Sequence, residues 1–426
     1  MKNGLVIGGS LVAALALTVV LFAGTLRAPR PDTPVDTQPT VSETEEAGHT
    51  KRDSLTVLGY AFSETVSTQS SKPLEKLPVQ TVTFVACGDN LIHSTVFADA
   101  KTLAEGTGRE YNFLPMYENV ADVIQNADLA FINQETPFGG TSRPYSGYPL
   151  FNTPDQMGED LVSLGFDIIG LANNHMLDST AKGYERTIDF WNEKENVVGI
   201  GGYKNKEDFE NIRVIEKNGI SIALLAYTYG TNGLVLPKGS ELVVPLAEDE
   251  VIDRQTKAAR KMADCVIVSI HWGVEDAFTP NATQKRQAQL MADNGVDVII
   301  GHHPHVLQPI TLLERADGGK TLCMYSLGNF LSGMMYSRNM VGGLFGFTIC
   351  KTQVGVMIED VSFIPTVCQY NNRIRGFKIY RFSEYTEDLQ KVHGAHKFDS
   401  GMSLASMRSI IDKTIPKEYL IEDFYA

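Results

Sequence analysis

The sequence predicts an α/β domain in which buried β-strands alternate with amphipathic helices. From about residue 79, short apolar runs rich in β-branched residues alternate with longer amphipathic stretches. Nearly continuous apolar strands are typical of sheets covered on both faces, and their alternation with helices is typical of α/β domains. Polar residues suited to metal binding follow many of these strands.

The expected strands and helices follow one another along residues 81–326. The strand candidates are residues 81–87, 128–133, 167–172, 197–200, 220–227, 265–270, 296–300 and 321–326. The helix candidates are residues 116–126, 154–164, 180–195, 253–263 and 281–294. Beyond Gly342, further apolar runs follow without intervening helices. This β-only end suggests a second sheet packed on the first.

Composition and charge limit the class of protein. The chain has 426 residues, of which 43% are hydrophobic, as in globular proteins. Its formal net charge of -14 argues against nucleic acid as a partner, because phosphate binding needs a basic face. The same charge would repel a polyanionic substrate. The five cysteines are odd in number and form no CxxC pair, so no disulfide framework is expected.

The N-terminal region predicts attachment to a membrane. Residues 4–26 contain no charge, and roughly 20 apolar residues suffice to cross a bilayer as a helix. An uncleaved single-pass anchor is favoured over a cleaved signal peptide, because no clear cleavage site follows. Residues 27–78 are rich in Pro, Thr, Ser and Glu and are expected to form a disordered stalk. The globular domain at 79–383 would then be extracytoplasmic.

The C-terminal residues 384–426 are polar and are expected to form a peripheral tail. His393 and His396 are expected to be exposed within it.

The strongest functional signal is the position of polar residues at the strand ends. In open α/β sheets, ligands collect at the carboxyl ends of strands, so these residues would converge on one crevice. Each has a structural alternative, such as a turn, a helix cap or a buried histidine. Five strand ends with the same property favour a shared site. The residues concerned are Asp89, His93, Glu135, Asn174, His175, Asp178, His271, Glu275, His303 and His305.

The donor types indicate the metal. Carboxylate, amide oxygen and imidazole together suit Mn, Fe or Zn, and the absence of cysteine from these loops disfavours a zinc-thiolate site. Two ions about 3.5–4 Å apart would activate water without a serine or cysteine nucleophile. Gly318-Gly319-Lys320-Thr321 is interpreted as a hairpin turn rather than a phosphate-binding loop.

The ordered motifs GDN…H, NQETP, NNHMLD, HWGVE, GHHPHV and YSLGNF resemble the CapA family of bacterial capsule (poly-γ-glutamate) synthesis proteins. The resemblance covers roughly residues 81–350. That family is similar in turn to the calcineurin-like metallophosphoesterases. The resemblance therefore implies a four-layer α/β/β/α sandwich that holds divalent metal ions, with two ions favoured over one.

The resemblance also implies roles for individual residues. His175 would be the phosphate-facing or general-acid histidine, with Asp178 in the same loop, and Glu135 would replace the bridging carboxylate. His302 would occupy a variable position. The first loop departs from the phosphoesterase pattern Asp-x-His, because His93 stands four residues after Asp89. The implied metal ligands are Asp89, His93, Glu135, Asn174, His271, His303 and His305.

Three functions remain open on these residues. The first is a metal-dependent hydrolase or transferase acting on a cell-envelope polymer, which the resemblance suggests is poly-γ-glutamate. The second is a non-enzymatic accessory subunit of a membrane capsule synthase, and the third is an envelope phosphatase. The candidate substrate contacts are Arg143 in the irregular loop 138–154, Glu275 and Asn329.

Overall fold

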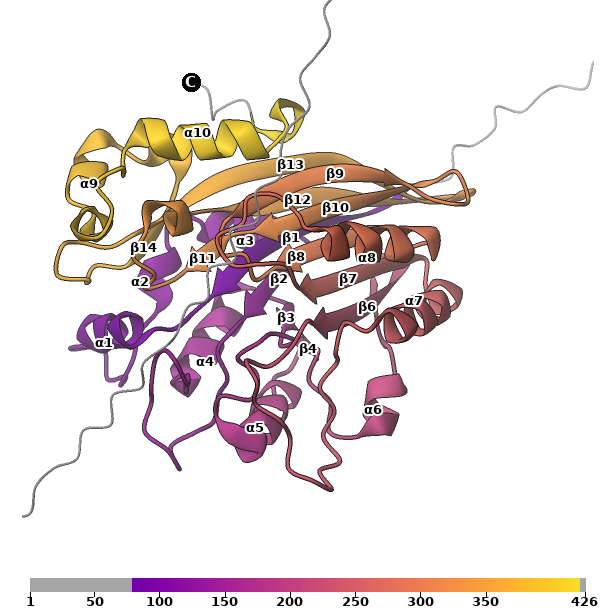
Figure 1. Cartoon of the computed structure of the whole chain (residues 1–426), viewed down its shortest axis with the longest axis horizontal. Helices are drawn as coiled ribbons and strands as arrows, with labels where there is room; N and C mark the ends of the chain where they lie inside the picture. The colour runs from indigo at the N-terminus through magenta and orange to yellow at the C-terminus, as the bar shows by residue number, and fades with distance from the viewer. Residues whose placement is uncertain (1–78, 422–426) are drawn as a thin grey trace, which may run out of the picture. The chain divides into compact units, whose positions relative to one another are not determined.

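The computed structural model describes residues 79–421 and contains two mixed β-sheets with helices packed against them (Figure 1). The predicted α/β class is therefore confirmed. Within residues 79–421, no helix has both the length and the apolar character needed to cross a membrane. The predicted anchor at 4–26 and the predicted stalk at 27–78 lie outside the described residues.

The first sheet has eight strands in the order β14-β13-β12-β1-β2-β3-β4, with β11 paired to the end of β1. Strands β1 to β4 are parallel, whereas β12, β13 and β14 join in antiparallel pairs. The strands are β1 (Gln80–Asn90), β2 (Leu129–Gln134), β3 (Ile168–Gly170), β4 (Val198–Ile200), β11 (Asn329–Leu331), β12 (Val341–Thr352), β13 (Gly355–Gln369) and β14 (Lys378–Arg381).

The strands after residue 341 do not form the separate second sheet that the sequence suggested. Instead, β12 pairs with β1 from Gln80 to Cys87, and β13 pairs with β12. An apolar pattern indicates that a strand is buried, but it does not specify the neighbouring strand. The prediction was wrong for that reason.

The second sheet is built from the middle of the chain, in the order β5-β6-β7-β8-β10-β9. Its four central strands are parallel, and β5 and β9 are antiparallel edge strands. The turn between β9 and β10 contains Gly318 and Gly319, which confirms the predicted hairpin. The strands are β5 (Arg213–Lys217), β6 (Ile220–Thr228), β7 (Cys265–His271), β8 (Val298–His302), β9 (Leu307–Glu314) and β10 (Lys320–Leu327).

The alternation of side chains along each strand determines how the layers pack. On β6, Ile222 and Leu224 join the core that the two sheets share, whereas Ala223 and Leu225 belong to a second core under α7 (Asp249–Met262) and α8 (Ala282–Asp293). Helices α4 (Asp155–Leu164) and α5 (Thr180–Asn192) pack beside β2, β3 and β4 (Figure 1).

Some of the remaining helices differ from the prediction. The helix expected at 116–126 is divided into α2 (Leu114–Tyr117) and α3 (Ala121–Asn126). The others are α1 (Ser94–Leu103), α6 (Lys206–Glu210), α9 (Glu387–Lys391) and α10 (Leu404–Thr414).

Residues 384–420 pack against the domain more closely than a polar composition suggested. Met407 and Ile411 of α10 are fully buried in the main core, because their spacing places both on one face of the helix. His393 is buried as well, and its Nε2 lies 3.0 Å from the Cys368 carbonyl oxygen. The expectation that His393 is exposed is therefore corrected.

Close packing at Gly301 fixes the end of β8, from which the HHPH run begins. A Cβ atom at Gly301 would collide with the Tyr325 carbonyl oxygen and lie 2.7 Å from Nε1 of Trp272. We therefore expect Gly301→Ala to lower the free energy of unfolding by about 1–3 kcal/mol, as overpacking does. Chemical denaturation of the full chain measures the difference. Gly230→Ala is the matched control, because a Cβ there meets no atom within 4 Å.

Candidate metal centre

Polar side chains from the ends of both sheets meet at one place. Asp89 is at the end of β1, Glu135 follows β2, and His271 ends β7 of the other sheet. One ligand atom from each of these three lies within 4.8 Å of the other two. All three side chains are fully buried. The predicted convergence of distant loops thus occurs at the junction of the two sheets.

Glu135 lies at the centre of this group. Its Oε1 is 3.5 Å from Nε2 of His271 and 3.7 Å from Nε2 of His305. Neither carboxylate oxygen has a hydrogen-bond partner among the described residues. Burial and the neighbouring charge of Asp89 raise the pKa of Glu135 well above its usual range. A buried carboxylate without a hydrogen-bond donor is costly unless a positive charge lies close to it.

Asp89 organises the HHPH loop around itself. One oxygen, Oδ2, accepts the backbone N–H of His303 at 3.2 Å, and the other, Oδ1, accepts Nδ2–H of Asn133 at 2.8 Å. Burial opposes ionisation, but the neighbouring imidazoles of His302 and His305 hold the pKa of Asp89 well below its usual range. His303 and His305 have φ angles of 97° and 56°, a conformation that side chains other than glycine seldom adopt. Contacts with Asp89 therefore help to hold a strained loop.

His305 lies between the two carboxylates. Its Nδ1 is 3.1 Å from Oδ2 of Asp89 and 3.0 Å from Oδ1 of Asn329, so this nitrogen carries a proton and donates it. Nε2 consequently faces Glu135. Burial lowers the pKa of His305, but the charges of Glu135 and Asp89 outweigh it and raise the pKa to about 10. In the absence of a metal, an imidazolium at His305 supplies the positive charge.

His271 and His303 differ from His305 because both are held neutral. Burial lowers the pKa of His271 well below its usual range and that of His303 to about 3. Nε2 of His271 lies 3.1 Å from Oδ1 of Asn174, which brings the predicted amide ligand to the same centre. Neutral imidazole is the form that binds metals.

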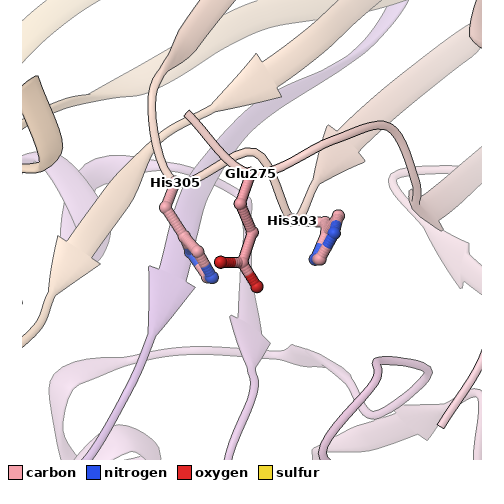
Figure 2. A group of neighbouring side chains, drawn as sticks. All are labelled: Glu275, His303 and His305. Atoms are coloured by element: carbon pink, nitrogen blue, oxygen red, sulfur yellow. The ribbon is translucent and has the colours of Figure 1, made fainter. Parts of the chain in front are cut away.

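A second group of possible ligands lies towards solvent. Glu275, His303 and His305 offer ligand atoms that all lie within 4.8 Å of one another. Figure 2 shows the Glu275 carboxylate between the two imidazoles. Glu275 is exposed, whereas both histidines are buried. This group therefore forms the solvent side of the centre.

The residues fit a divalent cation. The oxygens of Glu135, Nδ1 of His271 and Nδ1 of His303 are buried without hydrogen-bond partners among the described residues. Oxygen and nitrogen donors of this kind suit Mn, Fe or Zn. Two adjoining groups that include Asp89, Glu135, His271, His303 and His305 would accommodate one or two ions.

His175 and Asp178 form a pair beside this centre. Nδ1 of His175 lies 2.7 Å from Oδ2 of Asp178, and the same oxygen accepts the backbone N–H of Phe151 at 2.9 Å. Asp178 thus fixes the orientation of the imidazole ring. Nη1 of Arg143 donates to the Asp178 carbonyl oxygen at 3.3 Å, which places the predicted rim residue against the same loop.

Two predicted residues have other surroundings. His93 lies outside both groups of possible ligands, and its Nδ1 accepts the backbone N–H of Gly333 at 3.1 Å. Asn329 was predicted to contact substrate, but it is buried, and its amide donates to the Asn339 carbonyl oxygen at 3.0 Å. Because Asn329 also contacts His305, it is a positioning residue for that ring.

Three residues at the centre were missed. His302, assigned to a variable position, is buried with Nδ1 3.3 Å from Oδ1 of Asp89. Asn133 binds the same oxygen. The ring of Tyr229 lies 4.5 Å from that of His303, measured between centroids. Tyr229 directly follows β6, so the strand-end criterion used elsewhere in the chain would have found it.

Removal of the central carboxylate tests the centre directly. We expect Glu135→Gln to reduce bound divalent metal to near zero, because the amide lacks the negative charge placed between the histidines. The metal-free variant should unfold no more easily than the metal-free parent, since a buried charge has been removed. Elemental analysis and chemical denaturation measure these effects. Full metal content in the variant would contradict the assignment.

The pKa of His305 gives metal binding a pH dependence. With a pKa of about 10, His305 is protonated at neutral pH, so a metal that binds its Nε2 must displace a proton. We expect metal affinity to rise as the solution becomes less acidic and proton release to accompany binding. Calorimetry in two buffers of different ionisation enthalpy measures the release. Binding without proton release would exclude His305 Nε2 as a ligand.

The chain is similar in sequence to several known proteins. The family described as "Bacterial capsule synthesis protein PGA_cap" matches residues 83–334, which is more than half of the chain. The PGA biosynthesis protein CapA of Bacillus subtilis (strain 168) is 34% identical over 197 residues, covering 46% of this chain and 50% of that protein. The chain thus spans about half the length of this relative. The capsule biosynthesis protein CapA of Bacillus anthracis is 29% identical over 303 residues, covering 69% of this chain and 70% of that protein.

Two solved structures are more distant. The 5'-nucleotidase precursor from Thermus thermophilus has a TM-score of 0.41 at 12% identity, covering 71% of this chain and 54% of that chain. The calcineurin-like phosphoesterase YfkN from Bacillus subtilis has a TM-score of 0.38 at 15% identity, covering 68% of this chain and 91% of that chain. Similarity at this level carries no inference about activity.

Proposed function

Because this chain belongs to the bacterial capsule synthesis protein PGA_cap family, we propose that it is a metal-dependent hydrolase or transferase acting on a capsule or other cell-envelope polymer. The observation that carries the proposal is the buried Glu135 carboxylate, which has no hydrogen-bond partner among the described residues and lies between His271 and His305. A carboxylate in such surroundings is suited to sharing a cation between two sets of ligands.

The ligands come from separate strand ends. Asp89, Glu135 and His271 would form one side of the centre, with Asn174 next to His271, and Glu275, His303 and His305 would form the other. Bound there, a divalent cation would polarise the bond under attack and lower the pKa of water. The chain itself supplies rigidity, because Asp89 and Asn329 fix the His305 ring from behind.

His175 would transfer the proton. Its Nδ1 is engaged by Asp178, so Nε2 is the atom available to give a proton to the leaving group. Asp178 does not contact substrate in this scheme; it orients the ring, as the third member of a catalytic triad does. The retention of this pair beside the centre favours an enzyme over a binding subunit without activity.

The proposed location and partners rest on the predicted anchor and on the names of the relatives. We propose that residues 4–26 hold the protein in the cell membrane, with the domain outside the cytoplasm and close to capsule synthase subunits. The polymer would be anionic if it is poly-γ-glutamate, as the names of the relatives suggest. The acidic chain must then bind it at a place where positive charge is concentrated.

Substitution of the proton-transfer pair tests the enzymatic role. We expect His175→Ala to lower the rate of hydrolysis of a model phosphoester or of an amide polymer by about 10²–10⁴-fold. Asp178→Asn should cause a smaller loss, because the ring remains but its orientation weakens. Rates are measured on the metal-supplemented full chain, with metal content as the control. Unchanged rates in both variants would contradict the assigned roles, and a parent protein that binds metal but hydrolyses neither substrate would favour the accessory role.

A further inference from the structure

A basic depression lies on the C-terminal part of this acidic protein. It has a volume of about 660 Å³, and its lining includes Arg373, Lys391, His396 and Lys397 together with two asparagines. None of its lining residues is acidic. The segment 371–397 contains six Lys or Arg and only three Asp or Glu, whereas the whole chain has 37 and 51. This segment therefore has a net positive charge, although the net charge of the whole chain is negative.

The cations of the depression differ in their pairing. Lys391 is already paired with Asp388 and Glu387 on its own helix, α9. Within residues 79–421, by contrast, the side chains of Arg373 and Lys397 make no ion pair or hydrogen bond. Both are exposed. They come from separate segments, one after β13 and the other at the end of the 3-10 helix Gly394–Lys397, and they are the two cations available to a ligand.

The loop that carries Arg373 is held rigidly. The Arg373 backbone N–H donates to Oδ1 of Asn371 at 2.8 Å, and the Asn371 N–H donates to the Arg375 carbonyl oxygen at 2.8 Å. Ile374 has a φ of 54°, an unusual conformation for a β-branched residue. A fixed loop presents its cation and amide groups with less loss of entropy when a ligand binds.

The depression lies at the same end of the first sheet as the metal centre. Strands β1 and β13 are both antiparallel to β12, so they run in the same direction. The loop that begins at Asn371 follows the end of β13, just as Asp89 lies at the end of β1. The two sites therefore lie at the same end of the strands of this sheet.

A continuous series of contacts joins the two sites. The ring of His393, beside the depression, lies 4.7 Å from that of Tyr370. The Tyr370 hydroxyl donates to the Met334 carbonyl oxygen at 2.8 Å, and Sδ of Met334 lies 3.3 Å from Nδ2 of Asn329. Asn329 in turn contacts His305. The depression and the metal centre are thus parts of one packed structure.

We propose that this depression is an anion subsite, which holds carboxylates of a polymer chain whose reacting bond lies at the metal centre. Arg373 and Lys397 would each pair with a carboxylate, and the side chain of Asn372 would bond amide groups of the polymer backbone. Single exposed ion pairs contribute little, so binding would depend on several carboxylates of one chain acting together. The subsite would also explain how a protein of net charge -14 binds a polyanion.

Charge reversal in the depression tests the proposal, which rests on the proposed function for the choice of polymer and for the site of reaction. End-labelled poly-γ-glutamate is titrated with the full metal-loaded chain in detergent, and binding is followed by fluorescence anisotropy at low and at moderate salt. We expect the double variant Arg373→Glu/Lys397→Glu to weaken binding at least about tenfold at low salt, with a smaller difference at moderate salt because of screening. Metal content and hydrolysis of a small model ester should be unchanged.

A matched variant separates the subsite from net charge. Lys261→Glu/Lys285→Glu changes the chain's charge by the same amount, on exposed positions of α7 and α8, and should bind the polymer as the parent does. The proposal would be overturned if both double variants lost the same affinity for the polymer. It would also be overturned if Arg373→Glu/Lys397→Glu bound the polymer as the parent does. The proposal would also be overturned if Arg373→Glu/Lys397→Glu bound the polymer normally but no longer bound vesicles of anionic phospholipid. The depression would then be a contact with a membrane. Failure of the proposed function is distinguishable, because it would appear as absent metal or absent hydrolysis in the parent.

Discussion

The position of Glu135 is the constraint on which the rest of the centre depends. Its carboxylate is buried, lacks a hydrogen-bond partner among the described residues, and lies within 3.7 Å of imidazole nitrogens on two sides. An ionised carboxylate in such a place needs positive charge nearby. Without a metal, the protonated His305 provides it, and with a metal the cation would do so. The neighbouring residues would therefore allow a metal cation to take the place of the proton on His305.

Asp89 and Glu135 are both buried carboxylates at strand ends, but their structural roles differ. Asp89 accepts hydrogen bonds from Asn133 and from the His303 backbone and contacts His305, so its charge is well compensated by the protein. Glu135 receives no such hydrogen bonds from the part of the chain that the structure describes. The imidazoles of His302 and His305 lower the pKa of Asp89 despite its burial, whereas burial and the charge of Asp89 raise the pKa of Glu135. One carboxylate therefore fixes the loop, and the other is left available to a ligand.

Much of the centre could be predicted from the sequence, because carboxyl ends of parallel strands must lie at one edge of a sheet. That rule brings Asp89 and Glu135 together, whereas His271 ends a strand of the other sheet and reaches them only through the packing of the two sheets. It could not determine which side of the chain His93 would face at the start of α1, where a neighbouring backbone group engages its ring. Nor could it assign β12 to β1, since pairing between strands so far apart in the sequence leaves no local pattern. His302 was missed because the family resemblance assigned it to a variable position, although it ends β8 and its ring lies 3.3 Å from Asp89.

The two sheets each contribute only part of the ligand set, and this division has a mechanical consequence. Asp89 and Glu135 belong to one sheet, whereas His271, His303 and His305 belong to the other. A cation held between them would act as a cross-link between layers that otherwise depend on apolar packing and a few hydrogen bonds at this edge. Sliding of one layer over the other would break metal bonds as well as contacts between side chains, so the loaded protein should resist shear in a way that the empty protein does not.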